Sequence, residues 1–132
     1  MDDEGLRVDV INMSLVSYDT FSGPCDDTMT AFSKACAEAQ RRGIVLVASA
    51  GNDGLVGSMT LPACYSSVMA VGSVNDSWPL RVSSFSNRGP LLDLVAPGAM
   101  ITSTGLRGGI STFAGTSQAA PHVAAAAALM RQ

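Results

Sequence analysis

The chain has 132 residues, the length of one domain or of part of a larger one. Hydrophobic residues make up 47% and charged residues 14% of it, which excludes intrinsic disorder over most of the length. The net charge is −3, with eight Lys and Arg, so nucleic acid is not an expected partner. No apolar run approaches the roughly 20 residues of a membrane span, so no membrane partner is expected either. The acidic residues 2–4 are the reverse of a signal-peptide start.

The first elements are expected to form a strand–helix–strand unit. Residues 8–15 are rich in β-branched side chains and predict a short strand covered on both faces. After a loop over residues 17–27, the acidic pair before Thr28 predicts a helix start, and the basic residues before Gly43 predict its end. The apolar run 44–48 is typical of a buried central strand. Two strands joined by one helix predict a parallel pair with a right-handed crossover.

The second half predicts two more strands and a long helix. The strands are residues 68–74 and 92–96, the second ended by Pro97, and residues 110–113 form one arm of a small hairpin. Residues 117–130 are rich in alanine and predict a helix with Pro121 in its first turn. Because the chain starts just before a strand and stops inside an apolar helix, we expect a domain that is incomplete at both ends.

Three cysteines occur, and their spacing is unlike that of a zinc site. The chain has no pair of cysteines separated by two other residues and only one histidine. An odd number allows one disulfide with a free thiol, or three unlinked thiols in a reducing compartment. The spacing alone does not decide between these two alternatives. The three residues are Cys25, Cys36 and Cys64.

Three polar residues are candidates for chemistry. Ser117 follows a Gly-Thr pair at a predicted helix start, where a serine is either a nucleophile or a simple N-cap. Asn52 follows the central strand, where its amide would donate to an oxyanion or merely form a turn. His122 lies five positions after Ser117, about 500° around a helix, so the two side chains point to different sides. We therefore expect His122 to be structural.

Five segments together resemble one family. Residues 115–124, Gly-Thr-Ser-Gln-Ala-Ala-Pro-His-Val-Ala, are similar to the active-serine motif of subtilisin-like serine peptidases, the subtilases. The resemblance extends over about residues 8–130 and favours the nucleophile over the N-cap interpretation of the serine. Four further segments resemble other stretches of these peptidases in the family's order: residues 10–15, 47–52, 84–90 and 94–98.

The resemblance implies a fold and a reaction. The fold is α/β, three-layered with a mainly parallel sheet, and residues 1–132 would be the C-terminal part of the peptidase domain. The reaction is hydrolysis of peptide bonds in a polypeptide through an acyl-enzyme, and it requires no cofactor. Ser117 would be the nucleophile, and the Asn52 amide would donate to the oxyanion. The residues implied in substrate binding are Ser14, Leu15, Val16, Ala50, Gly51 and Thr116.

The chain departs from the family pattern in two ways. Val16 stands where the family most often has glycine, so substrate preferences do not carry over. The catalytic aspartate and histidine would lie upstream of residue 1, which makes the N-terminal half of the domain an implied partner and leaves the isolated chain inactive. The alternative is a non-catalytic pseudopeptidase or remnant with a peptide-binding groove. An unrelated α/β hydrolase is disfavoured because Ala119 replaces the glycine that ends that family's serine motif.

The resemblance carries four smaller expectations. Cys25 and Cys64 would form a disulfide, with Cys36 a small buried hydrophobic residue. The protein would be extracellular, as is usual in the family, although this chain carries no signal peptide. Structural calcium occurs in the family, but no acidic loop motif is present, so no metal site is assigned. Without the neighbouring strand of the domain, residues 8–14 would form an open sheet edge, and the isolated chain would be poorly soluble.

Overall fold

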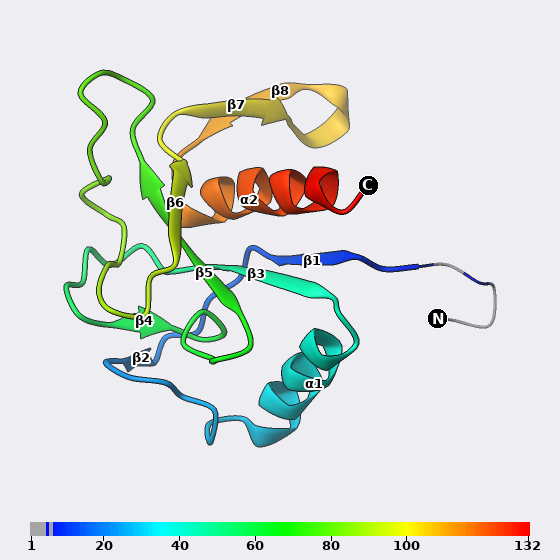
Figure 1. Ribbon diagram of the computed structural model, residues 1–132. Coiled ribbons are helices and arrows are strands. Elements are labelled where there is room, and N and C mark those ends of the chain that lie inside the picture. The colour runs from blue at the N-terminus through cyan, green and yellow to red at the C-terminus, as the bar shows by residue number, and fades with distance from the viewer. Residues whose placement is uncertain (1–4, 6) are drawn as a thin grey trace.

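A computed structural model describes residue 5 and residues 7–132. Its main sheet has four parallel strands in the order β1-β3-β5-β6 (Figure 1). The acidic start at residues 2–4 lies outside the described residues. The strands of this sheet are β1 (Val10–Met13), β3 (Val45–Ser49), β5 (Met69–Val74) and β6 (Leu94–Pro97).

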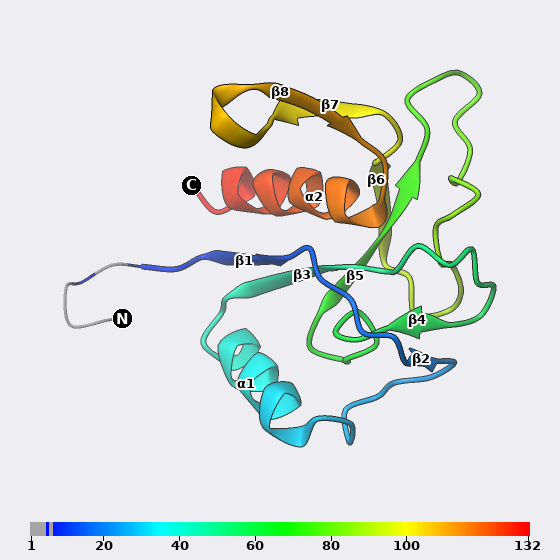
Figure 2. The same ribbon diagram turned by 180° about the vertical axis from the view of Figure 1, so that it is seen from behind.

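Two helices cover the opposite faces of this sheet. Helix α1 (Thr30–Arg41) lies on one face and α2 (Thr116–Met130) on the other, as Figures 1 and 2 show from opposite sides. The chain passes from β1 through α1 to β3, and β1 and β3 are parallel. The predicted three-layer α/β fold and the predicted strand–helix–strand unit are therefore confirmed.

The central strand β3 divides the interior into two clusters. Side chains of a strand alternate between the two faces of a sheet. Leu46 and Ala48 accordingly pack on the α1 side with Cys36, whereas Val47 between them packs on the α2 side with Ala119. β3 has strand neighbours on both sides and its last four residues are buried, so its prediction as a buried central strand is confirmed.

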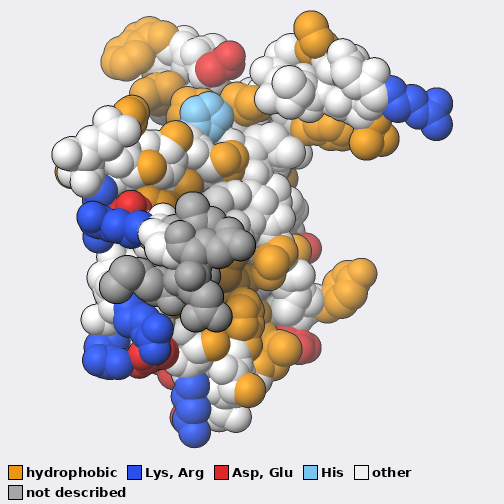
Figure 3. Space-filling view, turned by 90° about the vertical axis from the view of Figure 1, so that its right-hand side faces the viewer, with side chains coloured by type: hydrophobic (Ala, Val, Ile, Leu, Met, Phe, Trp, Pro, Cys, Tyr) orange, Lys and Arg blue, Asp and Glu red, His pale blue; other side chains and the backbone are white. Residues whose placement is uncertain are grey.

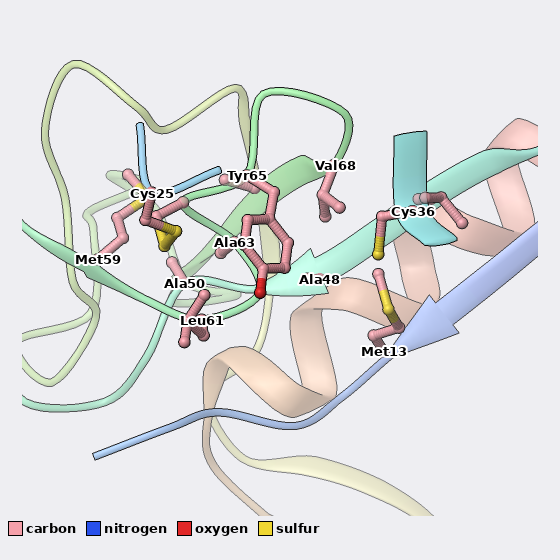
Figure 4. Packing of buried hydrophobic residues seen from close by; sticks show 13 residues of the cluster. Met13, Cys25, Cys36, Ala48, Ala50, Met59, Leu61, Ala63, Tyr65 and Val68 are labelled. Atoms are coloured by element: carbon pink, nitrogen blue, oxygen red, sulfur yellow. A yellow bond between two sulfur atoms is a disulfide. The ribbon is translucent and has the colours of Figure 1, made fainter. Parts of the chain in front are cut away.

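The cluster on the α1 side contains the free thiol. In Figure 4, Met13 and Cys36 point toward each other. Burial raises the pKa of the Cys36 thiol, which keeps it protonated and makes it a small hydrophobic residue, as expected. Tyr65 is also buried; its hydroxyl donates to the carbonyl of Thr28 at 2.9 Å and its ring meets Phe32 edge-on.

A disulfide ties the loop before α1 to the segment that follows β4 (Met59–Thr60). Cys25 and Cys64, the pair that the resemblance implied, form this bond, with their Cα atoms 5.5 Å apart. The backbone N–H of Cys25 also donates to the carbonyl of Cys64 at 3.1 Å. The two segments are thus held together by both a covalent bond and a hydrogen bond.

Two small antiparallel sheets complete the fold. β7 (Ile101–Thr104) pairs with β8 (Ile110–Phe113) across the short helix η1 (Leu106–Gly108), which confirms the predicted hairpin arm. β2 (Thr20–Phe21) pairs with β4. This second pair was not predicted, because strands of two residues carry no alternating pattern.

The predicted acidic start of α1 is wrong. The helix begins at Thr30, no acidic residue lies in its first turn, and Met29 before it is left-handed (φ 48°). The carboxylate of Asp26 instead accepts hydrogen bonds from the backbone N–H and hydroxyl of Ser66, at 3.0 and 2.7 Å. The carboxylate that was expected at the start of the helix therefore binds a residue distant in sequence. The C-terminal end of the helix, at Arg41 and Gly43, is as predicted.

The two outer strands also differ from the prediction. β1 was expected to be covered on both faces, but Ile11 in it is exposed. Among the described residues β1 pairs only with β3, which agrees with the open edge expected for residues 8–14. β6 begins two residues later than predicted and includes Pro97. Because β6 is an edge strand, the missing N–H of a proline there need not cost a bond between strands.

Candidate functional site

Ser117 lies at the start of α2. Gly115 occupies the N-cap position, Thr116 is the first helical residue and Ser117 the second, so the interpretation of Ser117 as a simple N-cap is wrong. The turn is fixed by the backbone N–H of Gly115, which donates to the carbonyl of Gly98 at 2.8 Å. A Cβ atom at residue 98 would lie 2.7 Å from the carbonyl oxygen of Gly115, so the close approach requires glycine.

Asn52 is bound directly to the residue before Ser117. Its side-chain oxygen accepts from the backbone N–H of Thr116 at 2.8 Å and from the Thr116 hydroxyl at 3.0 Å. The same hydroxyl accepts from the backbone N–H of Gly51 at 3.2 Å. Thr116 is fully buried, so these bonds are shielded from water. The loop after β3 and the start of α2 are thereby joined beside Ser117.

This arrangement leaves two hydrogen-bond donors free. Both bonds to Asn52 use its oxygen, and among the described residues its Nδ2 donates to no protein acceptor. In that same part of the chain the backbone N–H of Ser117 has no acceptor either, as expected in the first turn of a helix. A Cβ at residue 115 would lie 3.4 Å from Nδ2, which places the amide against the serine turn. Free donors at a helix N-terminus favour binding of a negative charge.

The end of β1 also reaches the serine turn. The Ser14 hydroxyl donates to the carbonyl oxygen of Ser117 at 2.8 Å. In an uninterrupted helix that oxygen would accept from the N–H of residue 121, but residue 121 is a proline and has none. Pro121 is the sixth helical residue, so its predicted place in the first turn is wrong. The proline leaves the carbonyl free for Ser14, and β1 is thereby linked to α2.

The other residues expected to bind substrate surround this junction. Leu15 and Val16 are about half exposed. The carbonyl of Leu15 accepts from the Ser49 hydroxyl at 3.1 Å, which fixes the backbone just after β1. Ala50 and Gly51 are both buried beneath Asn52. The structure therefore brings all the candidate residues to one edge of the sheet, while their roles in substrate binding stay predictions.

His122 is exposed and turned to its own helix. Its Nδ1–H donates to the carbonyl of Gln118 at 2.8 Å, four residues earlier. Figure 3 shows the pale blue histidine side chain at the surface among hydrophobic side chains. Among the described residues, no histidine or carboxylate forms a hydrogen bond with the hydroxyl of Ser117, which lies 3.5 Å from the carbonyl oxygen of Ser14. In the part of the chain that the structure describes, the serine therefore has no base.

A cleft of about 450 Å³ opens beside Ser117, between α2 and the first strand of the β7–β8 hairpin. Clefts that bind small molecules generally have volumes of about 300–1,000 Å³. Ser117 and Gln118, from the start of α2, are among the residues that line this cleft. The lining residues are Ile101, Thr102, Ser103, Ser117, Gln118, Pro121, His122 and Ala125.

One buried residue beside the site was not predicted. Asn87, in the loop before β6, is fully buried and forms hydrogen bonds with the loop that carries Asn52. The sequence offered one signal, since residues 84–90 resemble a family segment, but no local pattern distinguishes a buried asparagine from one in an exposed turn.

The described residues contain no cluster of three or more His, Cys, Asp or Glu side chains that would hold a metal ion. We therefore assign no site to the structural calcium that the resemblance allows. Within residues 5 and 7–132, neither helix combines the length and the apolar character needed to span a membrane.

Comparisons with known proteins show which family the chain matches. The model of the subtilase family, Peptidase_S8, matches residues 3–132. Over 126 residues the chain is 42% identical to the minor extracellular protease Epr of Bacillus subtilis (strain 168), covering 96% of this chain and 18% of that protein. Over 127 residues it is 45% identical to subtilisin E of the same organism, covering 94% of this chain and 31% of that protein.

Solved structures show the same likeness. A cold adapted subtilisin-like serine proteinase superposes with a TM-score of 0.75 at 39% identity, covering 92% of this chain and 41% of that one. The PagA protease, described as a prenylagaramide maturation protease, superposes with a TM-score of 0.77 at 28% identity, covering 93% and 45%. The chain thus spans less than half of either solved structure and less than a third of Epr or subtilisin E.

Proposed function

We propose that this chain, which belongs to the subtilase family, is the part of a serine endopeptidase that supplies the nucleophile and the side-chain donor to the oxyanion. Ser117 is the proposed nucleophile and Asn52 the proposed donor. The observation that carries the proposal is the pair of hydrogen bonds from Thr116 to the Asn52 oxygen, which leaves Nδ2 free beside the serine turn.

The proposed reaction proceeds through an acyl-enzyme. The oxygen of the Ser117 hydroxyl bonds to the peptide carbonyl carbon, and the carbonyl π electrons move to its oxygen. The hydroxyl proton passes to a base and then to the departing amine as the C–N bond breaks. Water then attacks the ester by the same route, releasing the acid and restoring the hydroxyl. The chemistry needs no metal ion or cofactor.

Oxyanion stabilisation supports this assignment. The negative oxygen of the tetrahedral intermediate would accept from the Asn52 Nδ2 and from the backbone N–H of Ser117. Both donors are free among the described residues, and both lie at the positive end of the α2 dipole. Their positions are fixed before substrate binds, because Thr116 is buried and bonded to the amide oxygen. Donors fixed in advance contribute most when charge develops in the transition state.

The substrate is proposed to be a polypeptide in an extended conformation. Residues 14–16 follow β1 and are exposed, so the backbone groups there that are not already bonded to Ser49 or Ser117 are open to pairing with an added strand. Residues 50–51 would form the opposite side of the pocket. Val16 is β-branched and about half exposed, so it would narrow the entrance where a glycine would leave it open. The chain would work outside the cell, where its disulfide is stable.

The proposal requires a base and an acid from another part of the domain. The N-terminal part of the same domain would provide a histidine for Ser117 and an aspartate to orient that histidine. Loss of the histidine alone lowers kcat by about 2 × 10⁶ in a peptidase of this type. We therefore expect the 132-residue chain by itself to hydrolyse no peptide bond at a measurable rate.

The test uses the longest product of the reading frame that contains this chain, here called the full-length product. A fluorophosphonate probe reacts with a serine only where a base activates it. The probe is expected to label the full-length product and its Ser22→Ala control, in which an exposed loop serine is replaced, and not Ser117→Ala. A folded full-length product that is not labelled would contradict the proposal and support a non-catalytic peptide-binding protein.

A second measurement tests the oxyanion donor. Removal of one such donor from a serine peptidase lowers kcat by about 10²–10³. Asn52→Ala in the full-length product is expected to lower kcat for a chromogenic peptide anilide by this factor, with little change in KM. An unchanged kcat would show that Asn52 has no part in the reaction.

A further inference from the structure

Asn87 is a fully buried asparagine whose side chain, among the described residues, forms hydrogen bonds only with the loop carrying Asn52. Its Nδ2 donates to the carbonyl of Ala50 at 3.1 Å, and its backbone N–H donates to the carbonyl of Gly51 at 3.0 Å. Its Oδ1 accepts from the backbone N–H groups of Asp53 and Leu55, at 3.1 and 3.0 Å. A weaker contact of 3.5 Å joins Nδ2 to the Asp53 carboxylate.

These bonds hold the backbone on both sides of Asn52. Residues 50 and 51 precede it, and residues 53 and 55 follow it, so one amide side chain spans the whole turn. Asn52 is itself exposed, and its side chain is held only from the Thr116 side. The direction of the free Nδ2 therefore depends on where the backbone of residue 52 lies. Asn87 holds that backbone on both sides of residue 52, together with the Thr116 hydroxyl bonded to the N–H of Gly51.

Gly51 shows how closely Asn87 fits under the turn. Its φ of +106° is one that residues with a side chain rarely adopt, and a Cβ there would collide with Nδ2 of Asn87. The turn is thus shaped around the buried amide. Removal of the Asn87 side chain would leave the backbone N–H groups of residues 53 and 55 and the carbonyl of residue 50 without these hydrogen bonds. The turn would then rearrange.

We infer that Asn87 is a positioning residue, which holds Asn52 in the geometry needed for oxyanion stabilisation. This inference rests on the proposed function. Asn87 acts through the backbone of residues 50–55, and it touches neither the reacting atoms nor Ser117. A misplaced donor weakens binding of the transition state more than binding of the substrate, so the effect belongs in kcat.

The first experiment compares two asparagines in the full-length product. Asn87→Ala is expected to lower kcat at least about tenfold with KM nearly unchanged, because one oxyanion donor accounts for about 10²–10³. Asn75→Ala is the matched control. The side chain of Asn75 also closes a loop, by accepting from the backbone N–H of Arg81 at 2.7 Å, but it lies outside the candidate site. Equal kcat values in the two variants would overturn the inference.

A double-mutant cycle separates positioning from general stability. If Asn87 acts through Asn52, adding Asn87→Ala to Asn52→Ala should change kcat less than twofold, because the donor is already absent. If the double variant instead lost kcat by the product of the two single-variant factors, the two residues would act independently and the inference would be overturned. If Asn52→Ala alone left kcat unchanged, or Ser117→Ala remained active, the proposed function itself would fail, and this outcome is distinct from failure of the Asn87 inference.

Hydrogen exchange on the unmutated full-length product keeps the inference testable should Asn87→Ala not fold. The amide protons of residues 53 and 55 are expected to exchange at least about tenfold more slowly than those of an unstructured chain. Asn87→Asp keeps the accepting oxygen and loses the donation to Ala50. It is therefore expected to retain this protection and to lower kcat. Unprotected amides in the unmutated protein, or an unchanged kcat in a folded Asn87→Asp variant, would overturn the inference.

Discussion

Thr116, the residue before Ser117 in the chain, holds the Asn52 loop through one buried hydroxyl. This hydroxyl donates to the side-chain oxygen of Asn52 and accepts from the backbone N–H of Gly51. A hydroxyl is one of the few groups that can do both. With the hydroxyl as donor, the amide oxygen faces Thr116 and the Nδ2 faces away from it. The backbone N–H and the side chain of the residue before Ser117 therefore determine which end of the Asn52 amide is free.

Thr116→Val tests this connection. Valine keeps the shape of threonine but leaves the N–H of Gly51 buried without a partner, which costs about 1–3 kcal/mol. We expect the urea denaturation midpoint of the full-length product to fall correspondingly. Thr102→Val is the control, since its hydroxyl forms an exposed pair with Thr112. A similar fall in the denaturation midpoint of both variants would show that the Thr116 hydroxyl contributes no more to stability than an exposed hydroxyl does.

At the scale of an element, α1 ends in a small cluster of charges. Glu38 accepts hydrogen bonds from Arg41 at 2.8 Å and from Arg42 at 2.7 Å. The hydrogen bond from Arg41, followed by that from Arg42, lowers the pKa of Glu38 from 4.5 to about 2. All three side chains are well exposed, so water weakens the pairing and its contribution to stability is small.

The pH dependence of this cluster has a definite direction. The pKa of Glu38 is lowered on folding, so the stabilisation is complete above pH 4.5 and is lost as the pH falls toward about 2. Glu38→Gln should therefore lower Tm slightly at neutral pH, and this difference should vanish near pH 2. Asp76→Asn, at an exposed carboxylate, is the control. A Tm difference for Glu38→Gln that grew on acidification would contradict the assignment.

The disulfide is the second feature at the scale of an element. It joins residues 39 positions apart and holds the loop before α1 against the segment after β4. A cross-link closing a loop of this length stabilises a fold by about 4 kcal/mol, chiefly by restricting the unfolded chain. We expect the double variant Cys25→Ser/Cys64→Ser to lose about this free energy of unfolding. A reducing agent should then destabilise the unmutated protein but leave the double variant unchanged.

At the scale of the whole molecule, apolar surface remains uncovered. β1 pairs only with β3 among the described residues, and Ile11 in it is 37% exposed. α2 is apolar nearly all round, yet Leu129 and Met130 near its end are exposed. A helix of this composition is usually buried. Figure 3 shows hydrophobic side chains at the surface on the side of the molecule that lies to the right in Figure 1. An open strand edge beside such a surface favours association between chains.

Ile11→Lys tests the contribution of the open edge. A lysine on an edge strand opposes pairing with another strand, so the 132-residue chain should shift from aggregate toward monomer. Light scattering coupled to size-exclusion chromatography measures this shift. Leu106→Lys adds the same charge at a highly exposed leucine in η1, away from the edge. If the monomer fraction rose equally in both variants, the added charge and not its place on the strand edge would be the cause of the reduced aggregation.

The parts of the fold that were predicted correctly rest on local patterns. The apolar run of β3, the alanine-rich α2 and the glycine after α1 each act through neighbours within a few residues. The errors occur where a distant partner decides. Asp26 binds Ser66 in place of the start of α1, and Ile11 of β1 is exposed although its own segment predicts a covered strand.

The sequence by itself determined the family, because five contiguous segments, two of which contain Ser117 and Asn52, follow the family's order. Only the tertiary structure decided how these residues are held. Ser14 donates to the carbonyl of Ser117, which is free because Pro121, 107 residues after Ser14, has no N–H. Asn87 bonds to both sides of a turn more than 30 residues away. Hydrogen bonds at such separations depend on the packing of the whole sheet, and no local pattern records them.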